Sequence, residues 1–324
     1  MTNKVPKVVL IYNKKDISTN ISKYLMSLTF TDYEKDQSDE LDLQLKDSDK
    51  YFQNSWRPQK GDKVAAQIGY ENEVLLDCGT FTIDETEWSS DDSGDVFVIR
   101  GLAASINQKI REKGSKSYKN KTLVDIAKKI GSKHGYTVAG GAGFIKIPYV
   151  AQLNESDMAF LQRISAQYGY IFKLTDTVIS FIPAEELDKK QSVIITDKDI
   201  EHISLRDSGT KTYNACSVKY VGKQGKLISY TARTAKQGTK SETLKLNIKC
   251  SSKTEAKRIA EAGLRNGSRV IEGEIDLKTG RSDIFAGRNV DLKINNSYSN
   301  TYRATKTTHR ITKDDYKTSL EVAA

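Results

Sequence analysis

Alternation of apolar and polar residues with a period of two recurs towards both ends of this 324-residue chain. In SDELDLQLKD, Leu41, Leu43 and Leu45 alternate with polar residues, which is the pattern of an antiparallel strand buried on one face. Turn residues such as Gly61 and Asp62 separate such segments, so the first hundred residues predict a small barrel or sandwich. The other strand-like segments contain Met26, Leu28 and Phe30; Val64, Ala66, Ile68 and Tyr70; GTFTIDETEW; and GDVFVIRGL.

Helical spacing replaces this alternation in the middle of the chain. The segment KTLVDIAKKIGSKHGYTV predicts a helix that follows a cap at Thr122 and ends at Gly135. Its expected buried face consists of Leu123, Ile126, Ala127 and Ile130.

A second helix is predicted in YVAQLNESDMAFLQRISAQYGYIFKL, between two strand-like segments. Asn154 is the expected N-cap, Asp157 follows three residues later as in a capping box, and Gly169 is the expected stop. The hairpin pattern YIFKLTDTVISFIP comes next, so this part of the chain predicts a compact α+β unit. The apolar residues at helical spacing are Met158, Leu161 and Ile164.

Strand patterns return afterwards and are interrupted by one helix, SSKTEAKRIAEAGLRNGS, which Ser252 or Ser251 can cap. The segment beginning AGRNVDLKINN has the same order of parts as the one beginning KGDKVAAQIGY. Each contains a glycine turn, an alternating strand, a loop and a long hairpin, which indicates an internal repeat. The matched residues are Gly61 and Gly287, Val64 and Val290, and Ile83 and Ile311.

These patterns together predict a mainly β fold with an α+β insertion. Two related antiparallel β-barrels would flank a small α+β domain. We place the first barrel at residues 1–105, the α+β domain at 106–190, and the second barrel, with one inserted helix, at 191–324.

Charge and cysteine content limit the classes of function. The formal net charge is +9, but lysines are spread along the chain without a dense block, which favours a solvated basic surface. Cys78, Cys216 and Cys250 are far apart and none lies in a CxxC motif, so we expect neither disulfides nor zinc. We find no membrane-spanning segment and no signal-peptide cleavage site, so synthesis in the cytoplasm is expected.

Candidate catalytic and metal-binding residues are few and isolated. His134, His202 and His309 lack an HExxH motif, so each is interpreted as a surface or packing histidine. Glu85 and Glu87 share one face of a predicted strand, but a hydrolase needs two carboxylates that face one cleft. We therefore expect no catalytic residue, no cofactor site and no metal site.

Two loops have compositions that can indicate binding sites. The run AGGAGF, at Ala139 to Phe144, lacks the GK[ST] ending of a phosphate-binding loop and is interpreted as a turn. The acidic segment SSDDSGD lacks the residue spacing of an EF-hand and is interpreted as a solvated turn.

The second helical segment, YVAQLNESDMAFLQRISAQYGYIFKL, resembles one found in hub proteins of contractile tails. These are the phage late control D family and the hub portion of the type VI secretion spike protein. The helix TEAKRIAEAGLRN and the ending YRATKTTHRITKDDYKTSLEV are also similar to that family, although Thr307 stands where a more apolar residue is expected. Length and order resemble most the hubs of myophages and defective prophages of Gram-positive bacteria. The matching residues are Gln152, Asn154, Glu155, Ser156, Asp157, Phe160, Leu161, Tyr168, His309, Tyr316, Thr318 and Leu320.

This resemblance implies a structural role in the baseplate of a virion or phage-like particle. It implies a homotrimer with pseudo-six-fold symmetry that joins a hexameric tail tube to a trimeric central spike and contacts other baseplate proteins. Nucleic acid would be a partner only in transit through the channel. Because the sequence stops after the last strand pattern, we also expect the spike and any lysozyme to be separate proteins.

Two other functions stay open on the sequence alone. A peptidoglycan-degrading tail hydrolase would need a carboxylate pair in a cleft of the middle unit. A glycan-binding or nucleic-acid-binding module is suggested by the +9 charge, and its binding to nucleic acid would weaken steeply with salt. The resemblance favours the hub, without catalysis.

Overall fold

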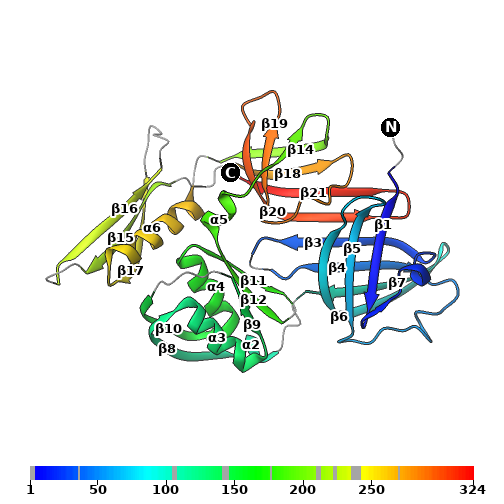
Figure 1. The fold of residues 1–324 in the computed structure, drawn as a ribbon, viewed down its shortest axis with the longest axis horizontal. Coiled ribbons are helices and arrows are strands. Elements are labelled where there is room, and N and C mark those ends of the chain that lie inside the picture. Colours follow the sequence, from blue (N-terminus) through cyan, green and yellow to red (C-terminus); the bar gives the residue numbers. More distant parts are fainter. Residues whose placement is uncertain are drawn as a thin grey trace.

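The computed structural model describes residues 4–35, 37–103, 108–140, 146–175, 177–208, 213–221, 225–234, 242–268 and 271–324. Most of the elements are strands, and the longer helices lie in the middle of the chain and in one later segment (Figure 1). The predicted fold class is confirmed, because two related antiparallel β units flank an α+β unit.

The first β unit surrounds its own apolar core. Its strands follow the order β3-β4-β7-β6-β5-β1, and each neighbouring pair is antiparallel. The alternating leucines Leu41, Leu43 and Leu45 are buried, as the period-two pattern predicts. The elements are β1 (Pro6–Tyr12), β2 (Lys15–Asp16), α1 (Ser18–Ile21), β3 (Leu25–Tyr33), β4 (Glu40–Lys46), β5 (Lys63–Tyr70), β6 (Leu76–Asp91) and β7 (Gly94–Leu102).

The second β unit repeats this order of strands as β14-β18-β21-β20-β19-β13. One edge differs, because β13 runs parallel to β19 whereas β1 runs antiparallel to β5. Val290 on β19 is buried like its predicted match, Val64 on β5. The strands are β13 (Val193–Thr196), β14 (Ile200–Asp207), β18 (Ile271–Leu277), β19 (Asn289–Lys293), β20 (Asn300–Ile311) and β21 (Tyr316–Ala323).

The two β units also share their irregularities. In the first unit, Met26 is the extra residue where β3 pairs with β4, and Asp84 is the extra residue where β6 pairs with β7. In the second unit, Glu201 and Thr305 occupy the equivalent places. A bulge reverses the alternation locally, so Met26 is 45% exposed although the period-two pattern predicts it to be buried. Matching bulges support the predicted internal repeat.

The glycine turns of the repeat are equivalent, but one predicted match is wrong. Gly61 and Gly287 both have positive φ angles, +94° and +83°. The Gly61 amide donates to the Ile83 carbonyl at 2.8 Å, and the Gly287 amide donates to the Ala304 carbonyl at 2.7 Å. Ile83 therefore corresponds to Ala304 and not to Ile311. The sequence comparison aligned the wrong residues because the hairpin of β19 and β20 is shorter than the equivalent hairpin of β5 and β6.

One strand pair joins the two β units. Residues 306–311 of β20 pair antiparallel with residues 28–33 of β3. The described strands of both units consequently form one 13-stranded sheet with two cores, and the core of the first unit also contains Ile311 and Tyr316 of the second unit.

The sheet has a polar face that points away from both cores. Alternation along the strands brings Asp42, Glu85 and Glu87 together around the Arg100 guanidinium, at 3.2, 2.9 and 2.9 Å. Along the strands from β14 to β6, strand register places ten carboxylates on this face: Glu40, Asp42, Glu85, Glu87, Asp91, Glu201, Glu272, Glu274, Asp276 and Glu321. Its cations are Lys46, Arg100, Arg206, Lys306, Arg310 and Lys317.

The middle unit contains the two predicted helices. In α3 (Leu123–His134), Thr122 and Asp125 form a capping box, and Gly135 ends the helix with a φ of +80°, as predicted. The hairpin of β11 and β12 is also present. The other elements are α2 (Gln108–Arg111), β8 (Lys113–Thr122), β9 (Thr137–Ala139), β10 (Lys146–Ser156), α4 (Asp157–Gln167), β11 (Tyr170–Thr175), β12 (Val178–Pro183) and α5 (Ala184–Asp188).

The cap of α4 differs from the prediction. Ser156, and not Asn154, is the N-cap, because the Ser156 hydroxyl accepts a hydrogen bond from the Ala159 amide at 3.1 Å. Asn154 has a φ of +50° and lies at a bulge in the pairing of β10 with β8. Gly169 has a φ of +75° and follows the helix, as predicted.

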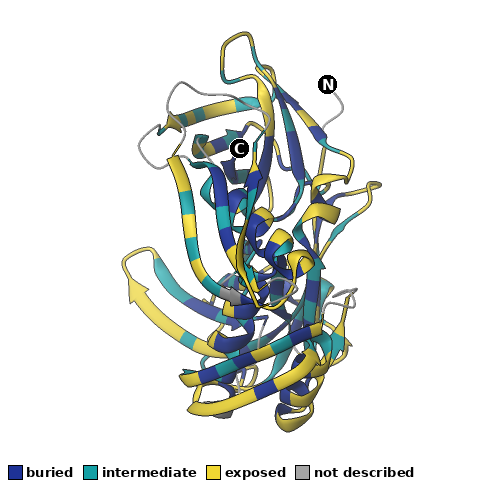
Figure 2. Cartoon of the chain, turned by 90° about the vertical axis from the view of Figure 1, so that its left-hand side faces the viewer, coloured by how far each residue is buried: buried dark blue, intermediate teal, exposed yellow. Residues whose placement is uncertain are grey.

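A separate sheet interrupts the second β unit. The strands β15 (Tyr213–Val221), β16 (Leu227–Arg233) and β17 (Glu242–Cys250) form it, and helix α6 (Lys253–Gly267) packs against it. Ser252 caps α6, as predicted. The sequence predicted strand patterns and one helix in this part of the second barrel, whereas the three strands form a sheet of their own outside the barrel. We call the described residues between 213 and 267 the arm, because they project from one side of the molecule (Figure 1). Ala215, Cys216 and Val218 of β15 are buried, whereas most of β16 is exposed or half-buried (Figure 2).

Candidate functional site at the joint of the β units

The pairing of β20 with β3 places buried side chains of both β units in contact. His309 lies opposite Phe30, and their rings are stacked with centroids 6.0 Å apart and an interplanar angle of 19°. Asp32 lies opposite Thr307, and both residues are buried. The joint is therefore formed by packed side chains as well as by the backbone ladder.

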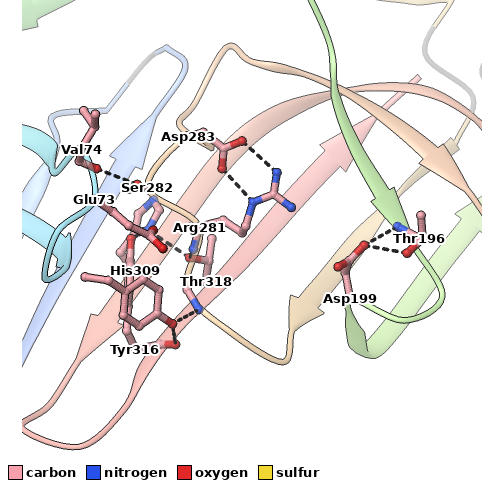
Figure 3. A network of polar contacts seen from close by, with 12 residues as sticks. Glu73, Val74, Thr196, Asp199, Arg281, Ser282, Asp283, His309, Tyr316 and Thr318 are labelled. Carbon is pink, nitrogen blue, oxygen red and sulfur yellow. Dashed lines mark hydrogen bonds and ion pairs between the residues drawn. The ribbon is translucent and has the colours of Figure 1, made fainter. Parts of the chain in front are cut away.

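His309 is held by two hydroxyl groups of β21. Its Nδ1 lies 2.9 Å from the Tyr316 hydroxyl and 3.1 Å from the Thr318 hydroxyl (Figure 3). Burial lowers the pKa of His309 to about 4 and raises the pKa of Tyr316 above its usual value. At neutral pH the imidazole is therefore uncharged. This arrangement suits packing and fits the interpretation of His309 as a packing histidine.

A connecting segment of the second unit is fastened to the first unit beside this histidine. The Gly280 amide donates to the Tyr316 carbonyl at 2.6 Å and to the Tyr70 hydroxyl at 3.2 Å. The Ser282 hydroxyl donates to the Val74 carbonyl at 3.0 Å (Figure 3). A Cβ at Gly280 would lie 2.1 Å from Tyr316 Cγ, so only glycine fits there.

The middle unit joins the same region through a buried ion cluster. Lys173 Nζ lies 2.5 Å from Asp32 Oδ1 and 2.9 Å from Asp39 Oδ2, and the Ala286 amide donates to Asp32 at 2.8 Å. Burial raises the pKa of Asp39 to about 6, although the Lys173 charge opposes that rise. Burial alone would lower the pKa of Lys173, but the two carboxylates outweigh it and raise this pKa. This cluster borders an open cleft of about 380 Å³.

A second ionic contact connects β20 with other parts of the chain. Arg303 contacts Glu34 at 3.7 Å and forms an ion pair with Asp188, which also pairs with Arg265 of the arm at 3.3 Å. The Asn289 side-chain amide donates to the carbonyl of Asp188 at 3.2 Å. Both β units, the middle unit and the arm therefore meet around β20.

The residues of the 152–157 segment form a polar cluster inside the middle unit. Asp157 accepts hydrogen bonds from Gln152 at 3.0 Å and from Lys133 at 3.0 Å, and it lies 2.8 Å from His134 Nε2. Burial alone would raise the pKa of Asp157, but these hydrogen bonds outweigh it and lower this pKa. Glu155 pairs with Arg163 on the surface. The cluster ties the end of α3 to the start of α4 and leaves Asp157 fully engaged.

The remaining candidate residues do not converge on one cleft. His202 is exposed on β14, and Glu85 and Glu87 share Arg100 on the polar face. In the described ranges no three His, Cys, Asp or Glu side chains gather as a metal site requires, and no helix is long and apolar enough to cross a membrane. Residues 141–144 of the glycine-rich run lie outside the described residues. The cysteines Cys78, Cys216 and Cys250 are buried and free.

The ion cluster of the joint was missed by the sequence analysis. One signal was present, because Asp32 follows Leu28 and Phe30 on the buried face of β3, where an acidic residue needs a partner. The partner could not have been found, because Lys173 is 141 residues away in the sequence. In this arrangement one ammonium group holds two carboxylates, which suits a structural joint.

Comparison with solved structures places the fold among tail proteins. A tail protein from Neisseria meningitidis aligns with a TM-score of 0.71 at 10% identity, over 99% of this chain and 97% of that chain. A 43 kDa prophage tail protein from Shewanella oneidensis aligns with a TM-score of 0.64 at 14% identity, over 98% of each chain. These likenesses define the fold as that of tail proteins.

Sequence comparison then gives the family. The phage tail baseplate hub (GPD) family model matches residues 82–315, and the chain belongs to this family. A probable baseplate hub protein of Escherichia phage P2 is 31% identical over 216 residues, which is 64% of this chain and 54% of that protein. The corresponding protein of Escherichia phage 186 is 25% identical over 301 residues, 89% of this chain and 75% of that protein. The resemblance seen in the sequence is confirmed.

Proposed function

We propose that this protein is the structural hub of a contractile tail or phage-like injection device. In this role it forms a homotrimer with pseudo-six-fold symmetry and joins the hexameric tail tube to the trimeric central spike. The observation that carries the proposal is the internal repeat of two β units with the same strand order and the same bulges. Three copies of a chain with two equivalent units present six similar surfaces.

Several further features support a structural role. The buried ion cluster of Lys173, Asp32 and Asp39 fixes the middle unit against both β units, which suits a part that carries load. We propose that the protein has no catalytic activity, contacts other baseplate proteins, and meets nucleic acid only in transit through the channel. Synthesis in the bacterial cytoplasm belongs to the same proposal.

The mass of the purified chain by multi-angle light scattering, with negative-stain images of the same peak, tests this function. We expect three chains and a six-lobed ring in top view. If the chain stays monomeric both alone and when co-expressed with neighbouring spike and tube proteins, the proposal is wrong. Zymography on cell walls tests the hydrolase alternative, which predicts a clear band that one Asp or Glu substitution removes.

A further inference from the structure

The positive charge of the chain is concentrated in the sheet of the arm. Residues 213–250 contain eight Lys and Arg residues and one Glu, a net charge of +7, whereas the whole chain carries +9. Strand register places Lys219, Arg233 and Lys245 on one face of this sheet, and all three are exposed. Helix α6 packs on the opposite face. None of the three cations forms an ion pair with another described residue. We call this face the basic face of the arm.

Strand β16 is a free edge of the same sheet. The strand order is β16-β15-β17, so among the described strands β16 pairs only with β15 (Figure 1). The Thr234 amide donates to the Asn214 carbonyl at 3.0 Å, which makes these two residues a hydrogen-bonded pair. Because such pairs alternate along an antiparallel ladder, the even-numbered residues of β16 direct their backbone groups towards β15. The backbone groups that point away from the sheet belong to Leu227, Ser229, Thr231 and Arg233.

The surroundings of this edge differ on its two faces. On the side of α6, residues 230–234 line an open cleft of about 580 Å³ that Leu264 also lines. The side chains of β16 on that side, Ile228, Tyr230 and Ala232, are mostly apolar. Near the tip of the arm, Leu227 and Ile228 are 58% and 40% exposed. An unpaired edge beside exposed aliphatic side chains marks a site of interaction.

We propose that the free edge of β16 binds an extended acidic segment of another baseplate protein, which adds to the arm as a fourth, antiparallel strand. The inference rests on the proposed function and names a surface for the proposed contacts with other baseplate proteins. In the added strand, acidic side chains would lie on the basic face and apolar side chains on the side of α6. Opposite charges on neighbouring strands stabilise a sheet, and backbone hydrogen bonds to an edge supply affinity.

The structure favours this occupant over two others. Antiparallel pairing of β16 with β16 of a second copy would place Lys219 and Arg233 of both copies on one face, where like charges repel. Single-stranded nucleic acid binds where exposed aromatic rings stack on its bases. The tyrosines of this sheet pack on the side of α6 instead, so the described part of the basic face offers no such ring. They are Tyr213, Tyr220 and Tyr230.

Fluorescence anisotropy with the purified full chain and a labelled peptide of alternating Glu and Val residues tests the strand pairing. In the antiparallel register, the Glu residues exchange both backbone hydrogen bonds with the outward-pointing residues of β16. N-methylation of the Glu amides should therefore weaken binding roughly tenfold or more. N-methylation of the Val amides, which point away from β16, keeps the same charge and should leave binding unchanged. Equal binding of the two methylated peptides, or no binding of the parent peptide, would overturn the inference.

Charge reversal tests the basic face with the same peptide. The variant K219E/R233E should bind it roughly tenfold more weakly or worse, because two attractive cross-strand pairs become repulsive. The matched control is K60E/K128E, which reverses two exposed lysines outside the arm. An equal loss of binding in both variants would show that only the net charge matters and would overturn the inference.

Cross-linking in the assembled particle identifies the natural occupant. Benzoylphenylalanine replaces Ser229, whose side chain lies on the basic face, and mass spectrometry identifies the peptide that is linked after irradiation. We expect a segment of another tail protein in which acidic and apolar residues alternate. No link, or a link to DNA or to a second hub copy, would overturn the inference. A particle that is trimeric by light scattering would still leave the proposed function intact, whereas a chain that binds the peptide but never forms trimers would overturn the proposed function alone.

Discussion

At the scale of single residues, the buried polar groups of the joint decide how firmly the units hold together. Thr307 and Thr318 are both fully buried on neighbouring strands, but their hydroxyl groups have different surroundings. The Thr318 hydroxyl accepts from the Arg281 amide at 2.9 Å, whereas the Thr307 hydroxyl has no hydrogen-bond partner among the described residues. A buried hydroxyl without a partner carries a desolvation cost.

Thr307→Val should therefore stabilise the protein, by about 1 kcal/mol, because the cost of the buried hydroxyl is removed without a change of shape. The matched substitution Thr318→Val should destabilise it by about 1–3 kcal/mol, because the Arg281 amide loses its acceptor. Urea unfolding of both variants measures the difference. Equal destabilisation by the two substitutions would contradict this account.

Asp39 predicts a pH dependence with a definite sign. Its pKa is about 6 in the folded protein and 3.8 ordinarily, so between these values the folded state binds a proton that the unfolded state lacks. Its contribution to the free energy of unfolding therefore falls as pH rises from about 4 to 6. Asp39→Asn removes this titrating group. As pH rises from about 4 to 6, the free energy of unfolding of the variant should therefore increase by up to about 3 kcal/mol relative to that of wild type. Unfolding curves at several pH values would show a constant difference if the prediction is wrong.

At the scale of elements, the sequence predicted correctly those features that depend only on residues close together in the chain. The cap at Thr122 and the stop at Gly135 follow from α3 itself, and both were predicted. The cap of α4 was misplaced because the bulge at Asn154 depends on pairing with β8, which the local sequence does not reveal. For the same reason the joint, which pairs residues more than 250 positions apart, could not be predicted. The boundaries 1–105, 106–190 and 191–324 stay a prediction.

Substitutions at the start of α4 test the assignment of Ser156 as the N-cap and of Asn154 as the bulge residue. Ser156→Ala should destabilise the protein by about 1 kcal/mol, because the Ala159 amide loses its acceptor. Asn154→Gly should be close to neutral, because glycine adopts a φ of +50° without steric cost. Thermal unfolding of the two variants distinguishes the roles, and the reverse order would show that Asn154 is the cap.

At the scale of the whole molecule, eight strands follow one path from β14 to β6, and this path includes the pairing of β20 with β3 that joins the two β units. In the proposed homotrimer, three such paths would form a wall of 24 strands around the channel. At a spacing of about 4.8 Å between strands, its circumference is roughly 115 Å, which leaves an opening rather than a packed core. The arm and the middle unit would remain attached to the outside of this wall.

If the polar face of the sheet lines the proposed channel, the charges of this face can be tested in the assembled particle. Replacing Glu272, Glu274 and Asp276 by lysine should make the particle retain duplex DNA, and that retention should disappear steeply as salt is raised. Native particles should show little retention, although the chain carries a net charge of +9. Gel shifts at two salt concentrations provide the measurement, and strong retention by native particles would contradict the assignment of this face to the channel.

The polar face of the sheet then has a consequence for transport. If it lines the opening, carboxylates outnumber cations along the wall, so the excess positive charge of the chain must lie on other surfaces. A phosphate backbone passing through would be weakly repelled on every side and would have few places to adhere. A nucleic acid could therefore pass through such a channel without binding tightly to its wall.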